Sequence, residues 1–136
     1  MIQTDVLIIG GGPVGLFTVF EAGLMKLRCH IIDAIPQAGG QLTEIYPKKP
    51  IYDIPGFPTV LAGELIENLL EQAAPFKPGF TLGERAETID KQEDGNFIVI
   101  TSEGTKHQAP VVMIAGGLGS FEPRKPKIEN LQQFEK

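Results

Sequence analysis

The residues with the clearest chemical meaning are the glycines between positions 10 and 15. This segment reads GGGPVG and matches the pattern G-x-G-x-x-G. Between a strand and a helix, such glycines permit a tight turn, admit a diphosphate and let the helix approach the strand. N–H groups at the positive end of the helix dipole would hold the diphosphate without a lysine. The candidate phosphate-binding residues are Gly10, Gly12, Pro13 and Gly15. The alternative is a glycine-rich turn that binds nothing.

A second candidate is Asp33, which lies 18 residues after Gly15. At this separation, a carboxylate that ends the second strand accepts hydrogen bonds from the hydroxyl groups of an adenosine ribose. The same carboxylate would repel a 2′-phosphate, so the pattern favours FAD or NAD over NADP at this site. The alternative is an aspartate that only caps a strand.

The elements that must position these residues follow from the apolar pattern. Residues 6–9 are an unbroken apolar run, which is typical of a strand buried on both faces of a parallel sheet. Residues 28–33 predict a second buried strand, so the two strands and the helix between them form a right-handed βαβ unit. The helix is predicted from apolar residues that recur every three or four positions: Leu16, Val19, Phe20, Gly23, Leu24 and Leu27.

The remaining pattern completes an α/β fold. Residues 34–61 contain five prolines and predict a long loop without a helix, and loops of this length are usually functional. Residues 62–73 predict a helix that ends before Pro75 and faces inward through Leu65, Ile66, Leu69 and Leu70.

The second half of the chain predicts two kinds of strand. An Asp-Gly pair at positions 94 and 95 predicts an antiparallel hairpin within a small β-meander at residues 84–110. Residues 111–115 predict a further parallel strand that rejoins the first sheet. The expected fold is a Rossmann-like FAD/NAD(P)-binding fold, with a parallel sheet flanked by helices and a small antiparallel β-meander.

Composition narrows the class of protein. The chain has 136 residues and a net charge of −5, which argues against a nucleic-acid surface. Its start lacks a signal-peptide pattern, and no apolar run approaches the length of a membrane span, so we expect a cytoplasmic protein that binds no membrane. Cys29 is the only cysteine and cannot form an intrachain disulfide. We expect Cys29 and His30 to pack in the core, His107 to lie at the surface, and no metal site to form.

Several motifs, taken in order, resemble those of ferredoxin–NADP reductases of the thioredoxin-reductase-like type. The resemblance covers essentially the whole chain. Each motif is weak alone, but together and in sequence they are specific. They are IIGGGPVGLF at residues 8–17, GGQL at 39–42, YP at 46–47, IYD at 51–53, PGFP at 55–58 and FEPRK at 121–125.

The resemblance implies FAD as the cofactor and assigns its contacts to individual positions. Asp33 would hold the adenosine ribose, and Ala86 would contribute its backbone to the adenine edge. Gln41 would bond the flavin end of the cofactor, and Tyr46 would stack against the isoalloxazine ring. Phe121 would pack near the cofactor from the far end of the sheet. The residues present include no catalytic acid, base or nucleophile.

The resemblance also implies how the chain is used. Residues 1–120 would form an incomplete N-terminal part of an FAD-binding domain, and residues 121–136 a linker towards an absent NADPH domain. In a full-length relative, NADPH would reduce the flavin, which would pass electrons to ferredoxin or flavodoxin, and the protein would be a homodimer. Alone, the chain is expected to be inactive, to hold FAD weakly and to expose a hydrophobic face.

Two alternatives remain open. A thioredoxin reductase shares the same flavin-domain motifs, although the insertion at residues 46–53 favours the ferredoxin type. A non-catalytic dinucleotide-binding module is the other. The basic residues Lys48, Lys49, Arg124, Lys125 and Lys127 would suit an acidic ferredoxin, but a solvated loop is the favoured explanation.

Overall fold

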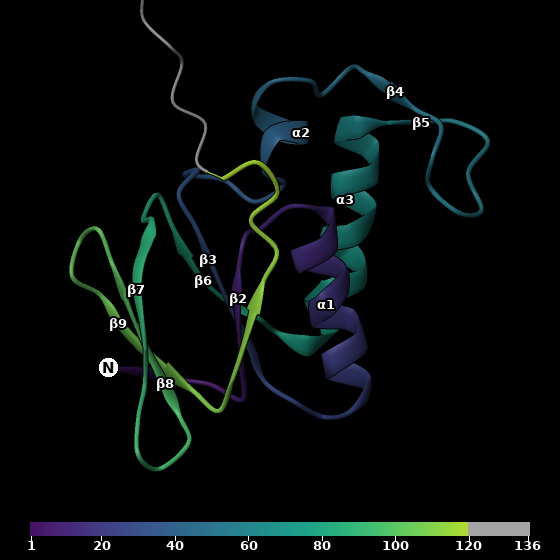
Figure 1. Ribbon diagram of the computed structural model, residues 1–136. Coiled ribbons are helices and arrows are strands. Elements are labelled where there is room, and N and C mark those ends of the chain that lie inside the picture. The colour runs from purple at the N-terminus through teal and green to yellow at the C-terminus, as the bar shows by residue number, and fades with distance from the viewer. Residues whose placement is uncertain (120–136) are drawn as a thin grey trace, which may run out of the picture.

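The computed structural model describes residues 1–119, apart from the side chains of Gln41 and Glu44. A parallel sheet lies between helices on one face and an antiparallel sheet on the other (Figure 1). The elements are β1 Ile2–Gln3, β2 Val6–Ile9, α1 Pro13–Leu24, β3 Cys29–Asp33, α2 Gln41–Glu44, β4 Pro50–Ile51, β5 Val60–Leu61, α3 Ala62–Ala73, a 3₁₀ turn Ala74–Phe76, β6 Gly79–Leu82, β7 Ala86–Lys91, β8 Phe97–Thr101, β9 Lys106–Ala109 and β10 Val111–Ile114.

The parallel sheet has the strand order β10-β2-β3-β6. Strands β2, β3 and β10 lie where the apolar runs predict them, and β2 and β3 are neighbours joined by α1, so the βαβ unit is confirmed. The fourth strand, β6, is not predicted from the sequence. It is a short Gly-Phe-Thr-Leu segment without an apolar run, and its pairing with β3 makes it a strand.

The central strands use alternate side chains to build two cores. Ile8 and Ile31 point towards α1 and α3, where they pack with Leu16, Val19 and Ile66. The intervening residues of the same strands pack on the antiparallel sheet, where Leu7 and Ile32 meet Val99 and Ala109. Burial on both faces explains why these strands have no polar alternation.

Helix α1 is shorter than its apolar pattern predicts. It ends at Leu24, and Lys26 adopts a positive φ of 62°. The prediction of an inward-facing apolar residue is therefore wrong at the last two positions, because Leu24 is 60% exposed and Leu27 is also exposed. The helix ends in a turn, in which the amides of Met25 and Lys26 donate to carbonyls of the last helical turn. This turn ends the helix before the side chains of Leu24 and Leu27 can reach the core.

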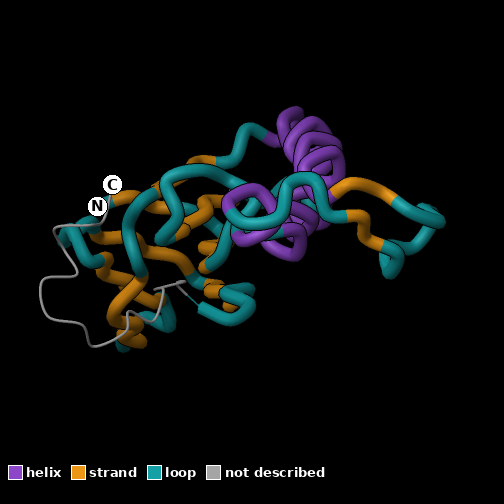
Figure 2. The backbone as a smooth tube through the Cα atoms, turned by 90° about the horizontal axis from the view of Figure 1, so that it is seen from above, coloured by secondary structure: helices purple, strands orange, loops and turns teal. Residues whose placement is uncertain are grey.

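Helix α3 matches its prediction in both limits and orientation. Leu65 and Ile66 are buried, and Leu69 and Leu70 are partly buried against the same core. The preceding region is predicted wrongly as a loop without a helix. It contains the single turn α2 and the two-stranded ribbon β4–β5, which projects beside α3 (Figure 2). The prolines flank the four residues of α2 rather than interrupt them.

The antiparallel sheet confirms the predicted meander. Its order is β1-β9-β8-β7, and the β7–β8 hairpin turns at Gly95, whose φ is 87°. Strand β1 was not predicted, because two residues carry no pattern; it pairs in parallel with β9.

One residue predicted at the surface is deeply buried. His107 in β9 is 0% exposed, so the surface prediction is wrong. It lies between the two sheets because the polar segment that contains it forms an inner strand of the antiparallel sheet, between β1 and β8. Cys29 and His30 are buried as predicted. Among residues 1–119, no cluster of three potential metal ligands occurs.

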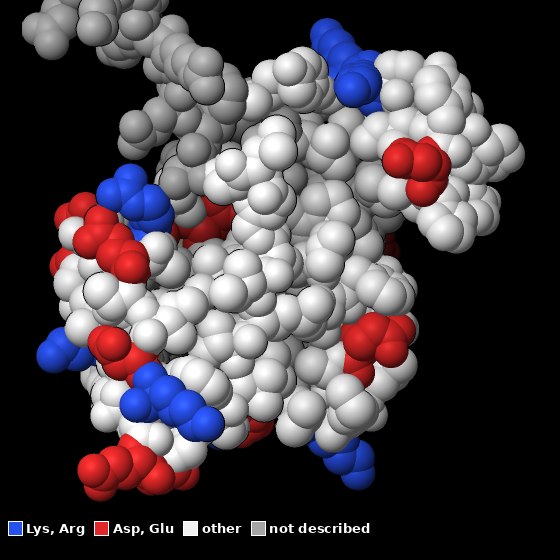
Figure 3. Space-filling model, viewed as in Figure 1, with Lys and Arg blue, Asp and Glu red and all other residues white. Residues whose placement is uncertain are grey.

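The face that carries β10 and α1 exposes several apolar side chains. Charged side chains gather on the antiparallel sheet instead (Figure 3). Strand β10 is an edge strand of the parallel sheet. The exposed apolar side chains on these two elements include Val14, Phe17, Val111, Met113 and Ile114. In the part of the chain that the structure describes, no helix has the length and apolar character needed to cross a bilayer.

Candidate functional site

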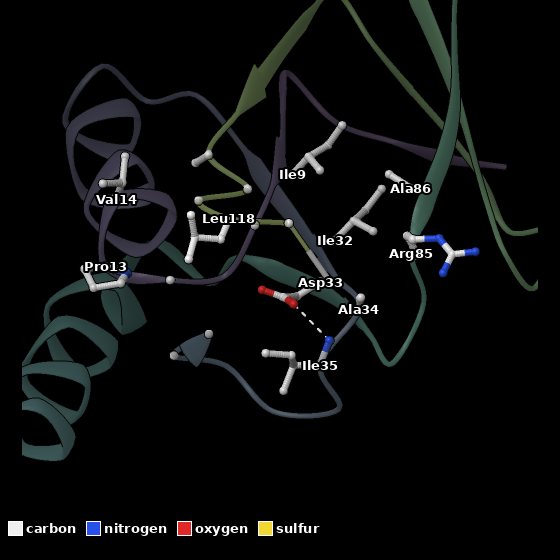
Figure 4. A pocket seen from close by; sticks show the side chains of 18 of the residues that line it. Ile9, Pro13, Val14, Ile32, Asp33, Ala34, Ile35, Arg85, Ala86 and Leu118 are labelled. Atoms are coloured by element: carbon white, nitrogen blue, oxygen red, sulfur yellow. Dashed lines mark hydrogen bonds between the residues drawn. The ribbon is translucent and has the colours of Figure 1, made fainter. Parts of the chain in front are cut away.

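A cavity of about 640 Å³ opens at the carboxyl ends of the parallel strands. This is where open α/β sheets bind ligands, and the volume suits a small-molecule site. Its wall combines the glycine turn after β2, the end of β3, the start of β7 and the turn after β10 (Figure 4). The lining residues include Gly10, Gly12, Asp33, Gly40, Ala86 and Gly116.

The three motif glycines meet different surroundings. Gly10 has a φ of 111°, and a Cβ there would lie 2.3 Å from the carbonyl oxygen of Ala115. A Cβ on Gly15 would lie 1.9 Å from the carbonyl oxygen of Gly10. A Cβ on Gly12, in contrast, would meet no described atom within 4 Å. The protein itself therefore requires Gly10 and Gly15, whereas Gly12 leaves room at the cavity for another molecule.

The start of α1 offers unpaired donors beside this room. Gly12 is the N-cap residue and provides no side-chain cap, and the first turn of the helix contains no acidic residue. Among the described residues, none accepts a hydrogen bond from the backbone amide of Gly12, Val14 or Gly15. Unsatisfied amides and the helix dipole both favour an anion at this position.

Asp33 lies against the glycine turn at the end of β3. Its Oδ2 accepts a hydrogen bond from the Gly11 amide at 2.6 Å, and its Oδ1 accepts one from the Ile35 amide at 2.9 Å. Each carboxylate oxygen retains acceptor capacity, and the side chain lies in the cavity (Figure 4). The carboxylate therefore braces the turn and can still receive hydroxyl groups of a ligand.

Replacing Asp33 by asparagine is expected to lower the free energy of unfolding by about 1–3 kcal/mol, because an amide NH2 group would then face one of the two backbone N–H donors. Urea unfolding of both proteins measures the difference. The exposed Asp53 provides the matched control, since Asp53→Asn removes a carboxylate from the surface. Equal stability of D33N and the unaltered chain would contradict the bracing role.

The other predicted cofactor residues do not all lie in the cavity wall. Ala86 lines the cavity at the start of β7. Gln41 begins α2, next to the lining residue Gly40, but its side chain lies outside the described set. Tyr46 is 50% exposed and lies outside the cavity wall, with Lys49 Nζ 5.4 Å from its ring centre. Phe121 lies outside the described residues.

Sequence reasoning missed part of the wall. Gly39 lines the cavity with a φ of 117°, and its amide donates to the carbonyl of Gly11 at 2.8 Å. The turn at residues 116–119 also lines it, with positive φ at Gly117 and Gly119. Both segments are glycine clusters, and the second follows an apolar strand. The sequence therefore contained a signal that could have placed both of them at the cavity. It marks a wall of the same cavity rather than a second phosphate-binding turn.

Comparison with known proteins finds ferredoxin–NADP reductases among the relatives of this chain. No family model matches the chain. Ferredoxin–NADP reductase 1 of Christiangramia forsetii is 76% identical over 135 residues, and ferredoxin–NADP reductase of Flavobacterium johnsoniae is 71% identical over 135 residues. The alignments cover 99% of this chain but 38% and 39% of those proteins. The chain thus spans less than half the length of these relatives.

Solved structures give the same fold. The thioredoxin reductase of Gloeobacter violaceus superposes with a TM-score of 0.67 at 28% identity, over 84% of this chain and 36% of that one. A thioredoxin reductase of Streptococcus pyogenes gives a TM-score of 0.73 at 24% identity, over 93% and 38%, and supports the fold alone. Over essentially all of its length, the chain is therefore a homologue of part of the ferredoxin–NADP reductases of the thioredoxin-reductase-like type, as its motifs indicate.

Proposed function

We propose that the cavity binds FAD and that the chain is the FAD-binding part of an oxidoreductase that passes electrons between NADPH and ferredoxin or flavodoxin. One observation carries the proposal. The open position at Gly12, the unpaired amides of α1 and the Asp33 carboxylate all border one cavity. A diphosphate joined to a ribose fits this donor and acceptor set. The names of the relatives support the redox assignment.

Different residues of the cavity would bind different parts of FAD. The amides of Gly12 and Val14 would hold the diphosphate, Asp33 the adenosine ribose, and the backbone of Ala86 the adenine edge. Gln41, Tyr46 and Phe121 are proposed for the flavin end on the family resemblance. Bound FAD would supply the redox chemistry by accepting a hydride and releasing electrons singly.

The described residues of the cavity bind and orient rather than transfer protons. Among the described residues that line the cavity, Asp33 is the only carboxylate, and backbone amides donate to both of its oxygens. Apolar side chains such as Ile9, Ile32 and Leu42 would keep water from the bound cofactor. The hydride is accordingly expected from the nicotinamide cofactor, and the partner protein would accept the electrons that the flavin releases.

We extend the proposal to domain organisation. Residues 1–120 would belong to the FAD-binding domain, residues 121–136 would lead towards an NADPH domain, and the whole protein would form a homodimer. The exposed apolar surface of β10 and α1 supports a covering by further polypeptide, since contiguous apolar patches usually mark contact surfaces. A ferredoxin partner is proposed from the family alone.

A thioredoxin reductase is the second candidate, favoured by the solved structures that the fold matches. The identity of 76% to a ferredoxin–NADP reductase, against 28% to the thioredoxin reductase structure, favours the first candidate.

The 136-residue chain by itself is expected to purify without yellow colour, to bind added FAD weakly and to show no NADPH oxidation. Its sequence contains one G-x-G-x-x-G segment. Because this segment is assigned to FAD, no second segment of this kind is present to bind NADPH. Absorbance at flavin wavelengths and NADPH consumption with ferricyanide as the electron acceptor measure both properties. Robust turnover by the chain would overturn the assignment. Tight FAD retention would favour a self-sufficient dinucleotide-binding module.

A further inference from the structure

Two buried histidines meet across a threonine between the two sheets. Thr81 Oγ1 lies 2.8 Å from His30 Nε2 and 2.9 Å from His107 Nε2. The two imidazole rings are 5.0 Å apart between centres. His30 and Thr81 are each 8% exposed, and His107 is 0% exposed. Since these residues belong to β3, β6 and β9, the network joins the parallel sheet to the antiparallel sheet.

The single hydroxyl proton of Thr81 determines how the two rings are protonated. It can be donated to one imidazole only, so the other imidazole must donate its own N–H to Oγ1. Among the described residues, Nδ1 of His107 has no hydrogen-bond partner. A buried N–H without an acceptor is rarer than an unpaired acceptor. His107 therefore donates from Nε2 to Thr81, Thr81 donates to His30 Nε2, and His30 carries its proton on Nδ1.

A second proton on either ring disrupts this arrangement. On His30 it would occupy Nε2, which accepts the Thr81 hydroxyl, and on His107 it would place a buried N–H at Nδ1 without an acceptor. Burial and the neighbouring His107 lower the pKa of His30 to about 4. Burial also lowers the pKa of His107, against the attraction of Glu84 and with a smaller contribution from the N-terminal amine. Strands β2, β6 and β8 contain no other titratable side chain.

The network is connected along the chain to one wall of the cavity. Thr81 lies in β6, and the segment after β6 leads directly to Arg85 and Ala86 in the cavity wall. This segment is tied to both sheets, because the Glu84 amide donates to the Asp33 carbonyl and the Thr101 hydroxyl donates to the Glu84 carboxylate. Loss of the contact between the sheets would therefore release this wall.

We propose that His30, Thr81 and His107 form an acid-sensitive clasp that docks the antiparallel sheet on the parallel sheet and holds the Arg85–Ala86 wall of the cavity. The clasp works only while both imidazoles are neutral. This property is independent of which ligand the cavity binds.

The direction of the pH dependence follows from the lowered pKa values. The opened form binds protons with an ordinary histidine pKa of 6.5, whereas the docked form of His30 binds them only near pH 4. The clasp is at full strength above pH 6.5 and weakens as the pH falls towards 4. For His30 alone, the opening equilibrium should increase roughly 30-fold between pH 8 and pH 5.

Nuclear magnetic resonance of the 136-residue chain tests the protonation states directly, because the sequence contains only two histidines. At pH 7 we expect His107 to carry its proton on Nε2 and His30 on Nδ1. Both should titrate below pH 6.5, with His30 near pH 4. Titration of both rings near pH 6.5 in the folded chain would overturn the proposal, and this measurement requires no variant.

Hydrogen–deuterium exchange, corrected for the intrinsic effect of pH, tests the mechanical role. Between pH 8 and pH 5, we expect segments 83–91 and 106–109 to lose about 30-fold protection, whereas α3, on the opposite face of the parallel sheet, changes little. Equal loosening of α3 would indicate global acid unfolding and contradict a clasp.

Variants separate the histidines from other acid effects. The double variant His30→Gln, His107→Gln keeps a polar amide near each Nε2 position but cannot titrate, so the difference between pH 8 and pH 5 should disappear. Thr81→Val should loosen the same segments at both pH values, and Thr81→Ser, which retains the hydroxyl, should restore them. An unchanged pH response in the double variant would refute the role of the histidines.

Discussion

Replacing Gly12 by alanine is expected to weaken FAD binding roughly 10–100-fold while the fold remains intact, because a methyl group would occupy the space left for the diphosphate and displace it from the α1 amides. The backbone of Gly12 has a φ of −73°, which alanine adopts without strain. The free energy of unfolding should change by about 1 kcal/mol or less, the usual cost of alanine at a helix N-cap.

Calorimetric titration with FAD and urea unfolding of the same preparations measure both quantities for Gly12. Unchanged FAD affinity in G12A would place the diphosphate elsewhere and remove the main support for the proposed site. A large loss of stability in G12A would instead mean that the open position at Gly12 is needed by the protein itself.

Replacing Gly15 by alanine is expected to destabilise the fold by about 3 kcal/mol or more. The new Cβ would lie 1.9 Å from the Gly10 carbonyl oxygen and 3.3 Å from Ile8 Cγ2, so the backbone of the turn or the whole of α1 must move. Elsewhere in a helix, the same substitution normally stabilises by up to about 1 kcal/mol, so the sign of the effect is diagnostic.

Urea unfolding of G15A beside G12A makes a matched pair, since the same methyl group is added within one turn. The structure predicts lost stability for Gly15 and lost binding for Gly12. If G15A were as stable as the unaltered chain, the close approach of α1 to the glycine turn would not be essential.

The sequence alone determined those helices and strands that can be recognised from the pattern of adjacent residues. Largely apolar runs identify β2, β3 and β10, because strands of parallel sheets are rich in apolar residues; β2 and β3 are buried on both faces, whereas β10 is an exposed edge strand. The limits of α3 follow from its apolar spacing and Pro75. The meeting of Asp33 with the glycine turn also follows from sequence, because adjacent parallel strands end at the same edge of the sheet.

Only the tertiary structure decided the features that depend on a distant partner. Strand β6 exists because it pairs with β3, and the 116–119 turn joins the cavity because β10 pairs with β2. His107 is buried because β9 lies inside the antiparallel sheet, although its own segment is polar. Burial and pairing are set by contacts between residues far apart in the chain, and local periodicity carries no information about which segment will cover another.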